Sequence, residues 1–169
     1  MMKLLGAVLI IAGCGGVGFA MCQNHRHVER AMEQLIKSLD WMVLELNFRM
    51  PPLSDLCRGA AQVSKGCVSR VMENLSVELE RQLTPNAAAC MAAALASESK
   101  VPPLVEEHLR NLGMTLGQFD LHGQIAELEA TAALCRRDVE ALRGNRELRL
   151  RNYQTLGICA GVALVILFL

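Results

Sequence analysis

Cysteine is the residue type in this chain best suited to chemistry, but its spacing does not favour any. Of the seven cysteines, four lie in the charged middle of the chain: Cys57, Cys67, Cys90 and Cys135. They form no CxxC pair, which a zinc ribbon or a thioredoxin-type dithiol would need. We interpret the four as small buried side chains of a reducing compartment. A membrane-bound thiol redox protein using Cys57 or Cys67 stays as an alternative.

The histidines and acidic residues also lack a catalytic arrangement. His25 and His27 are two positions apart, so in a helix they face different ways. His108 and His122 are isolated, and no local acid or nucleophile is placed to give either a catalytic role. The chain also lacks a GxxxxGK[ST] loop. We therefore predict no catalytic, cofactor-binding or metal-binding residue, and we do not expect an enzyme.

Glycines near the amino terminus match a nucleotide motif but favour a different use. Residues 13–18 spell GxGxxG, yet a dinucleotide fold needs alternating strands and helices, and the rest of the chain is typical of helices alone. In an apolar segment, small residues at four-residue spacing let another helix approach closely. The candidate packing residues are Ala12, Gly16 and Ala20 in the first segment, and Gly157 and Gly161 in the last.

Uncharged segments at both ends of the chain predict two transmembrane helices. Residues 4–22 contain no charged side chain, and neither do residues 156–169. A helix over residues 4–22 would span roughly 28 Å, close to the hydrocarbon thickness of a bilayer. The second segment, counted from Tyr153, is near the lower limit of length for a membrane-spanning helix. We therefore expect a transmembrane helix at 1–22, a soluble helical bundle at 23–152 and a second transmembrane helix at 153–169.

Basic residues beside these segments predict the orientation. Arg143, Arg146, Arg149 and Arg151 precede the last segment, whereas only Lys3 lies beyond the first. By the positive-inside tendency, the middle domain is cytosolic. The alternative comes from Ile11-Ala12-Gly13-Cys14, which resembles a lipobox. Processing at Cys14 would produce an externally facing lipoprotein with a helical binding domain.

The middle domain shows helical periodicity throughout. The first apolar stripe runs at steps of three and four until Pro51: Val28, Met32, Leu35, Leu39, Met42 and Leu46. Further helices are expected over residues 53–63 and 67–83, from the cap Thr84-Pro85 through 96, from Pro102 to 116, and from Asp120 onward.

Gly117 is placed to stop the fifth of these helices, and Asp120 to start the sixth. The predicted fold is all-α: an antiparallel bundle of about six helices flanked by an N-terminal and a C-terminal transmembrane helix. Zero net charge and 4% aromatic residues argue against a nucleic-acid partner.

Three segments resemble stage III sporulation protein AB of endospore-forming bacteria. They are the opening Lys3 to Gly13, the junction Leu116-Gly117-Gln118-Phe119-Asp120, and the ending Tyr153 to Gly157 with its apolar tail. The likeness covers the full chain, and the junction is its most distinctive part. Residues 59–96 match less well.

The resemblance implies a role in the transenvelope channel complex between mother cell and forespore. The soluble domain of this family is similar to the cytoplasmic domain of type II secretion inner-membrane platform proteins. It implies a non-enzymatic scaffold in the mother-cell membrane, coupling the ATPase stage III sporulation protein AA to other members of the complex. The family carries no catalytic motif or cofactor to this chain. A homo-oligomer is left open.

Overall fold

The computed structural model describes residues 26–81 and 86–168, with side chains up to residue 144. All regular secondary structure in this part is helical, and no strand occurs in it. A first helix covers residues 26–48. It is followed by α2 (Leu53–Val63), α3 (Cys67–Arg81), α4 (Ala87–Ala96), α5 (Pro103–Thr115) and α6 (Leu121–Phe168). The prediction of an all-α fold is confirmed.

Proline and one residue of positive φ end the first helix where the sequence places a break. The last helical hydrogen bond joins the Arg49 N–H to the Glu45 carbonyl at 2.8 Å. Met50 then adopts a φ of 49°, and Pro51 disfavours the α conformation for the residue before it. The chain turns back here, which brings α2 alongside the first helix.

The start of α4 differs from the predicted one. The sequence places the N-cap at Thr84, but Asn86 is the residue that caps the helix, because its Oδ1 accepts a hydrogen bond from the Ala88 N–H at 3.0 Å. Asparagine is as good an N-cap as threonine or better, and it lies directly before the alanine-rich segment. The cap prediction at Thr84 is therefore wrong by two residues.

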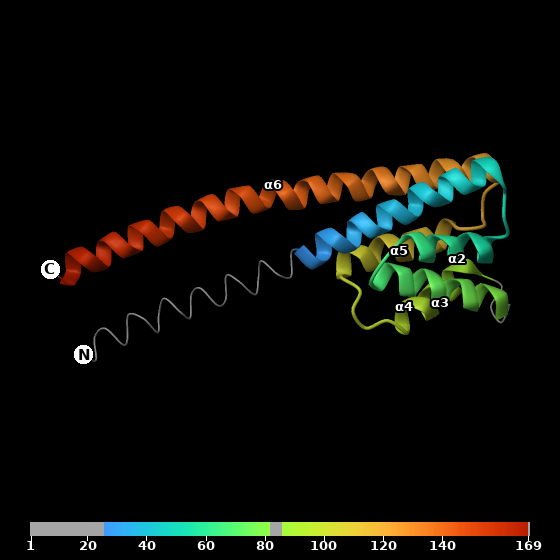
Figure 1. Cartoon of the computed structure of the whole chain (residues 1–169), viewed down its shortest axis with the longest axis horizontal. Helices are drawn as coiled ribbons and strands as arrows, with labels where there is room; N and C mark the ends of the chain where they lie inside the picture. Colours follow the sequence, from blue (N-terminus) through green and yellow to red (C-terminus); the bar gives the residue numbers. More distant parts are fainter. Residues whose placement is uncertain (1–25, 82–85, 169) are drawn as a thin grey trace.

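The four short helices form a compact group beside two long ones (Figure 1). Contacts follow the order of the chain, from α2 to α3, α3 to α4, α4 to α5 and α5 to α6. Helix 26–48 lies along the first part of α6 and runs in the opposite direction (Figure 1). We call helix 26–48 and α6 the long helix pair.

Buried apolar side chains form one core between these helices. The predicted stripe of the first helix is buried from Met32 to Leu46. On α6 the buried residues are Leu128, Ala132, Cys135 and Val139. This spacing of four, three and four turns one face of α6 toward the bundle. The core therefore includes the long helix pair and holds it against the short helices.

Two glycines allow close contact between helices. A Cβ built on Gly59 of α2 would lie 1.9 Å from the ring atom Cη2 of Trp41, and one on Gly113 of α5 would lie 2.5 Å from the Cβ of Met91. Real Cβ atoms essentially never approach this closely, so a larger residue would force either the neighbouring side chain or the helices themselves to shift. Neither glycine stands out in the sequence.

The first predicted transmembrane segment, residues 1–22, lies outside the described residues. α6 continues without a break across the predicted boundary at residue 153 and reaches Phe168. Among the described residues, no helix is both long and apolar enough to cross a membrane. The domain boundaries 1–22, 23–152 and 153–169 stay a prediction.

Candidate functional site

The long helix pair is held together by ion pairs at its surface. Arg143 of α6 donates to the carboxylates of Glu29 and Glu33, with nitrogen to oxygen distances of 2.6 and 2.5 Å. Nearer to the start of α6, Arg136 donates to Asp40 of the first helix at 2.5 Å. Exposed pairs of this kind contribute about 0–1 kcal/mol each. They set the register of two helices whose association depends mainly on the buried stripe.

A histidine links α5 to the same long helix. The Nε2 of His108 lies 2.7 Å from the Oδ2 of Asp138 on α6. Glu106 and Glu107 directly precede His108 in the sequence, but its partner in the fold is an acid 30 residues further along the chain. The prediction of an isolated His108 is therefore wrong, and the pair ties α5 to α6.

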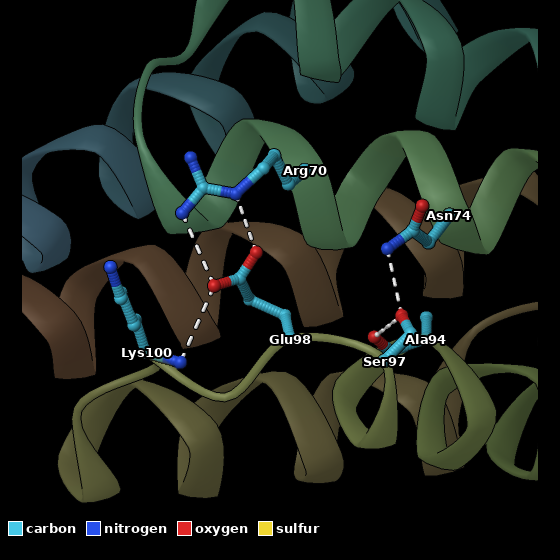
Figure 2. A network of polar contacts seen from close by, with 6 residues as sticks. All are labelled: Arg70, Asn74, Ala94, Ser97, Glu98 and Lys100. Carbon is cyan, nitrogen blue, oxygen red and sulfur yellow. Dashed lines mark hydrogen bonds and ion pairs between the residues drawn. The ribbon is translucent and has the colours of Figure 1, made fainter.

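A second polar network fastens the α4–α5 connection to α3 (Figure 2). Arg70 donates through Nε to Glu98 at 2.5 Å, and the Lys100 backbone N–H donates to the same carboxylate at 3.3 Å. Asn74 donates to the Ser97 hydroxyl at 2.8 Å. The hydrogen bond from Arg70 lowers the pKa of Glu98. All these side chains are used in joining helices.

The junction between α5 and α6 is built from Gly117, Asp120 and Gln124. Gly117 has a φ of 76°, in the left-handed region that favours glycine. Its N–H donates to the Gln124 side chain at 2.9 Å. The Oδ1 of Asp120 accepts from the Gly123 N–H at 3.1 Å, directly before the first residue of α6. Gln124, which the sequence analysis did not single out, fixes the direction in which α6 leaves this turn.

The cysteines of the described part are placed for packing. Cys57, Cys67, Cys90 and Cys135 are all buried. Burial raises the pKa of Cys57 to about 12 and that of Cys135 to about 12. Burial also raises the pKa of Cys67. Because the thiolate is the reactive form, the raised pKa values disfavour thiol redox chemistry at Cys57, Cys67 and Cys135.

Chemistry by a metal centre finds no support in the described residues either. Among them, no group of three histidine, cysteine, aspartate or glutamate side chains is placed to hold an ion. What the fold does offer is an exposed apolar surface.

This surface lies at one end of the bundle, where the connections before α2 and before α6 meet. Phe48 is 78% exposed, Met50 63%, Phe119 52% and Met114 49%. We call these four residues the exposed tip. A Cβ on Gly117 would lie 3.7 Å from Leu53, so the connections before α2 and before α6 are neighbours. α6 starts at this end and runs away from it to Phe168 (Figure 1). The exposed tip is therefore at the opposite end of α6 from residue 168.

The predicted membrane packing residues are not brought together by any described contact. Ala12, Gly16 and Ala20 lie outside the described residues, as does Cys14 of the lipobox-like segment. Gly157 and Gly161 lie in α6 where only the backbone is described. Their role in helix packing stays a prediction.

Comparison with known proteins identifies relatives of this architecture. The family model for stage III sporulation protein AB matches residues 3–169. A solved structure titled stage III sporulation protein AB is similar with a TM-score of 0.60 and 18% identity, covering 72% of this chain and 98% of that chain. At that identity the structural likeness supports the fold. No curated protein matches the sequence.

Proposed function

Since the chain belongs to the stage III sporulation protein AB family, we propose that this sporulation protein is a non-enzymatic membrane scaffold. In this proposal the helical bundle is cytosolic and lies at the mother-cell membrane around the forespore. It couples a cytosolic secretion-type ATPase, stage III sporulation protein AA, to the channel complex between the two cells.

One observation carries the proposal: α6 is a single helix from Leu121 in the bundle to Phe168. At about 1.5 Å per residue its 48 residues are roughly 72 Å long. Its first part is buried in the core, and its remainder extends beyond the bundle (Figure 1). A helix resists bending because each turn is bonded to the next, so a displacement at one end reaches the other end.

The contacts around α6 favour transmission from the bundle. Buried residues from Leu128 to Val139 fix α6 against the core. Arg143, the last side chain of α6 with a described ion pair, joins it to the first helix. The two long helices therefore move together as far as Arg143, and beyond that point α6 alone is described. A push or twist on the bundle would be passed to the segment that we expect in the membrane.

The exposed tip is the surface that we assign to the ATPase. It holds the most exposed large apolar side chain of the described residues, Phe48. Exposed apolar patches on soluble domains commonly mark protein interaction sites. Its position at the far end of α6 from residue 168 turns it away from the proposed membrane.

A proline at position 144 tests the mechanical part of the proposal. Gly144 lies one residue beyond Arg143, and a Cβ there would meet nothing within 4 Å. Gly144→Pro breaks the helix at a cost of about 3 kcal/mol, whereas the control Gly144→Ala strengthens it by about 1 kcal/mol. We expect Gly144→Pro to lower the yield of heat-resistant spores sharply while ATPase binding is kept, and Gly144→Ala to sporulate normally. Normal sporulation of Gly144→Pro would refute rigid coupling.

A charge in the exposed tip tests the partner surface. Phe119→Asp should reduce co-purification of the ATPase with the full chain, because burying a charged carboxylate in an apolar interface costs free energy. Leu134→Asp is the matched control, since Leu134 of α6 is also exposed, at 50%, and lies outside the tip. Equal ATPase recovery with the two variants would exclude the tip as the binding surface.

A further inference from the structure

A pocket with a basic wall lies at the opposite end of the bundle from the exposed tip. Its volume is about 280 Å³, and it is formed by the first turns of helix 26–48 and by the connection between α2 and α3. Three basic side chains line it: His27 and Arg30 from the helix, and Lys65 from the connection. Residues far apart in the sequence thus bring positive charge to one hollow.

The two permanently charged side chains of this pocket are not engaged in ion pairs within the described residues. Neither Arg30 nor Lys65 makes an ion pair within this part of the chain. The acids nearest in sequence to Arg30, Glu29 and Glu33, are both bonded to Arg143. In the first turns of helix 26–48, Glu29 and Glu33 therefore face α6, whereas Arg30 faces the pocket.

The start of α3 adds positive potential at the same place. Gly66, in the pocket wall, has a φ of 72° and its carbonyl accepts the first bond of α3 from the Arg70 N–H at 3.3 Å. Glycine has no side chain to cap the N–H groups that follow. Such groups and the helix dipole favour an anion at a helix N-terminus.

An unpartnered amide also faces the hollow. Gln34 lines the pocket, and its Oε1 is buried without a hydrogen-bond partner among the described residues. A buried polar atom in this state costs about 1–3 kcal/mol. A ligand hydroxyl could donate to it, and rotation of the amide would offer two N–H donors to a ligand oxygen. The pocket therefore has an adaptable polar group beside its cations.

We propose that this pocket binds a phosphate group. Phosphate matches the chemistry of the wall, because its oxygens accept from guanidinium, ammonium and helix N–H donors together. The phosphate can come from an anionic phospholipid headgroup or from solution. In the sequence, His27 follows the uncharged segment 4–22 closely, so a bilayer that holds this segment brings lipid phosphates to this end of the bundle. The lipid source rests on the membrane placement proposed above.

The test uses the full chain in detergent micelles and native mass spectrometry. Binding of phosphatidylglycerol is compared with that of phosphatidylcholine, with and without inorganic phosphate. The variants are Arg30→Gln and Lys65→Gln, and the control is Lys37→Gln, which removes an exposed charge of the same helix outside the pocket. Helical content by circular dichroism shows that each variant is folded. Of the two pocket substitutions, Lys65→Gln disturbs folding less, because Lys65 lies in a connection and is exposed.

We expect a preference for phosphatidylglycerol that falls about fivefold with each pocket variant and is unchanged in Lys37→Gln. If inorganic phosphate competes with the lipid, the site binds free phosphate. If inorganic phosphate does not compete, the site binds the lipid headgroup. Equal binding by pocket variants and control, or no binding of either ligand, would overturn the proposal. Failure of the membrane placement would instead leave the full chain in the aqueous fraction of a detergent-free lysate.

Discussion

Replacement of Gly59 by alanine tests the contact between the first helix and α2. The new Cβ would lie 1.9 Å from Cη2 of Trp41, and 2.6 and 2.7 Å from the two neighbouring ring atoms. The ring is rigid, so either the indole rotates or the helices separate. Overpacking of this kind costs about 1–3 kcal/mol, while alanine in place of glycine inside a helix gains about 1 kcal/mol. We expect a net loss of about 1 kcal/mol in the free energy of unfolding.

A double-mutant cycle separates these two contributions. In a Trp41→Ala background the ring is gone, so Gly59→Ala should now stabilise the protein by up to about 1 kcal/mol. The coupling energy between the two positions is then about 1–3 kcal/mol. Urea unfolding followed by circular dichroism measures all four proteins. Trp41 is the single tryptophan of the chain, so its fluorescence also reports directly on the contact in the Gly59→Ala protein.

The result that would refute this reasoning is additivity. A coupling energy below about 0.5 kcal/mol would mean that the two sites are independent. Helix 26–48 and α2 would then not be in contact at Gly59, and the packing of the first helix on the bundle would be different from the one described.

Three further predictions follow from other contacts. Gly113→Ala should destabilise the protein, because its Cβ would meet the Cβ of Met91, which cannot rotate away, and this overpacking cost of about 1–3 kcal/mol outweighs the gain of about 1 kcal/mol from alanine in a helix; an unchanged urea midpoint would contradict this. Cys57 should resist alkylation at neutral pH, where its raised pKa of about 12 keeps it protonated; labelling of the native chain as fast as of the urea-unfolded chain, by mass spectrometry, would disagree. The lowered pKa of Glu98 means that its bond with Arg70 stabilises the fold above the usual glutamate pKa and is lost as pH falls through the lowered one; the difference in midpoint between wild type and Glu98→Gln should therefore vanish in acid, and a constant difference would count against it.

The helices themselves could be predicted from the sequence because their signals are local. The helix expected over residues 53–63 matches α2, since proline precedes it and Gly66 follows it closely. The buried stripe of the first helix was visible as apolar steps of three and four. The error at the start of α4 arose because Thr84 and Asn86 are both good caps, and only the geometry at Asn86 decides between them.

The contacts between helices could not be predicted in the same way. His108 meets Asp138, and Arg143 meets Glu29, over separations of 30 and 114 residues. No periodicity relates such positions, because they depend on how helices are rotated against each other. The basic pocket has the same origin, since Arg30 and Lys65 come together only when the α2–α3 connection folds against the first helix.

The pairing of helix 26–48 with α6 means that, during synthesis, the first helix waits for a partner that is made much later. The buried side chains of helix 26–48 leave the ribosome early, but their partners on α6 follow much later, as the sequence separation of 96 between Asp40 and Arg136 indicates. At about 5–20 residues per second this interval lasts roughly 5–20 s. During that time the apolar face of helix 26–48 is exposed in the nascent chain. A chaperone or the bilayer itself must shield this face until the carboxyl-terminal half has been synthesised.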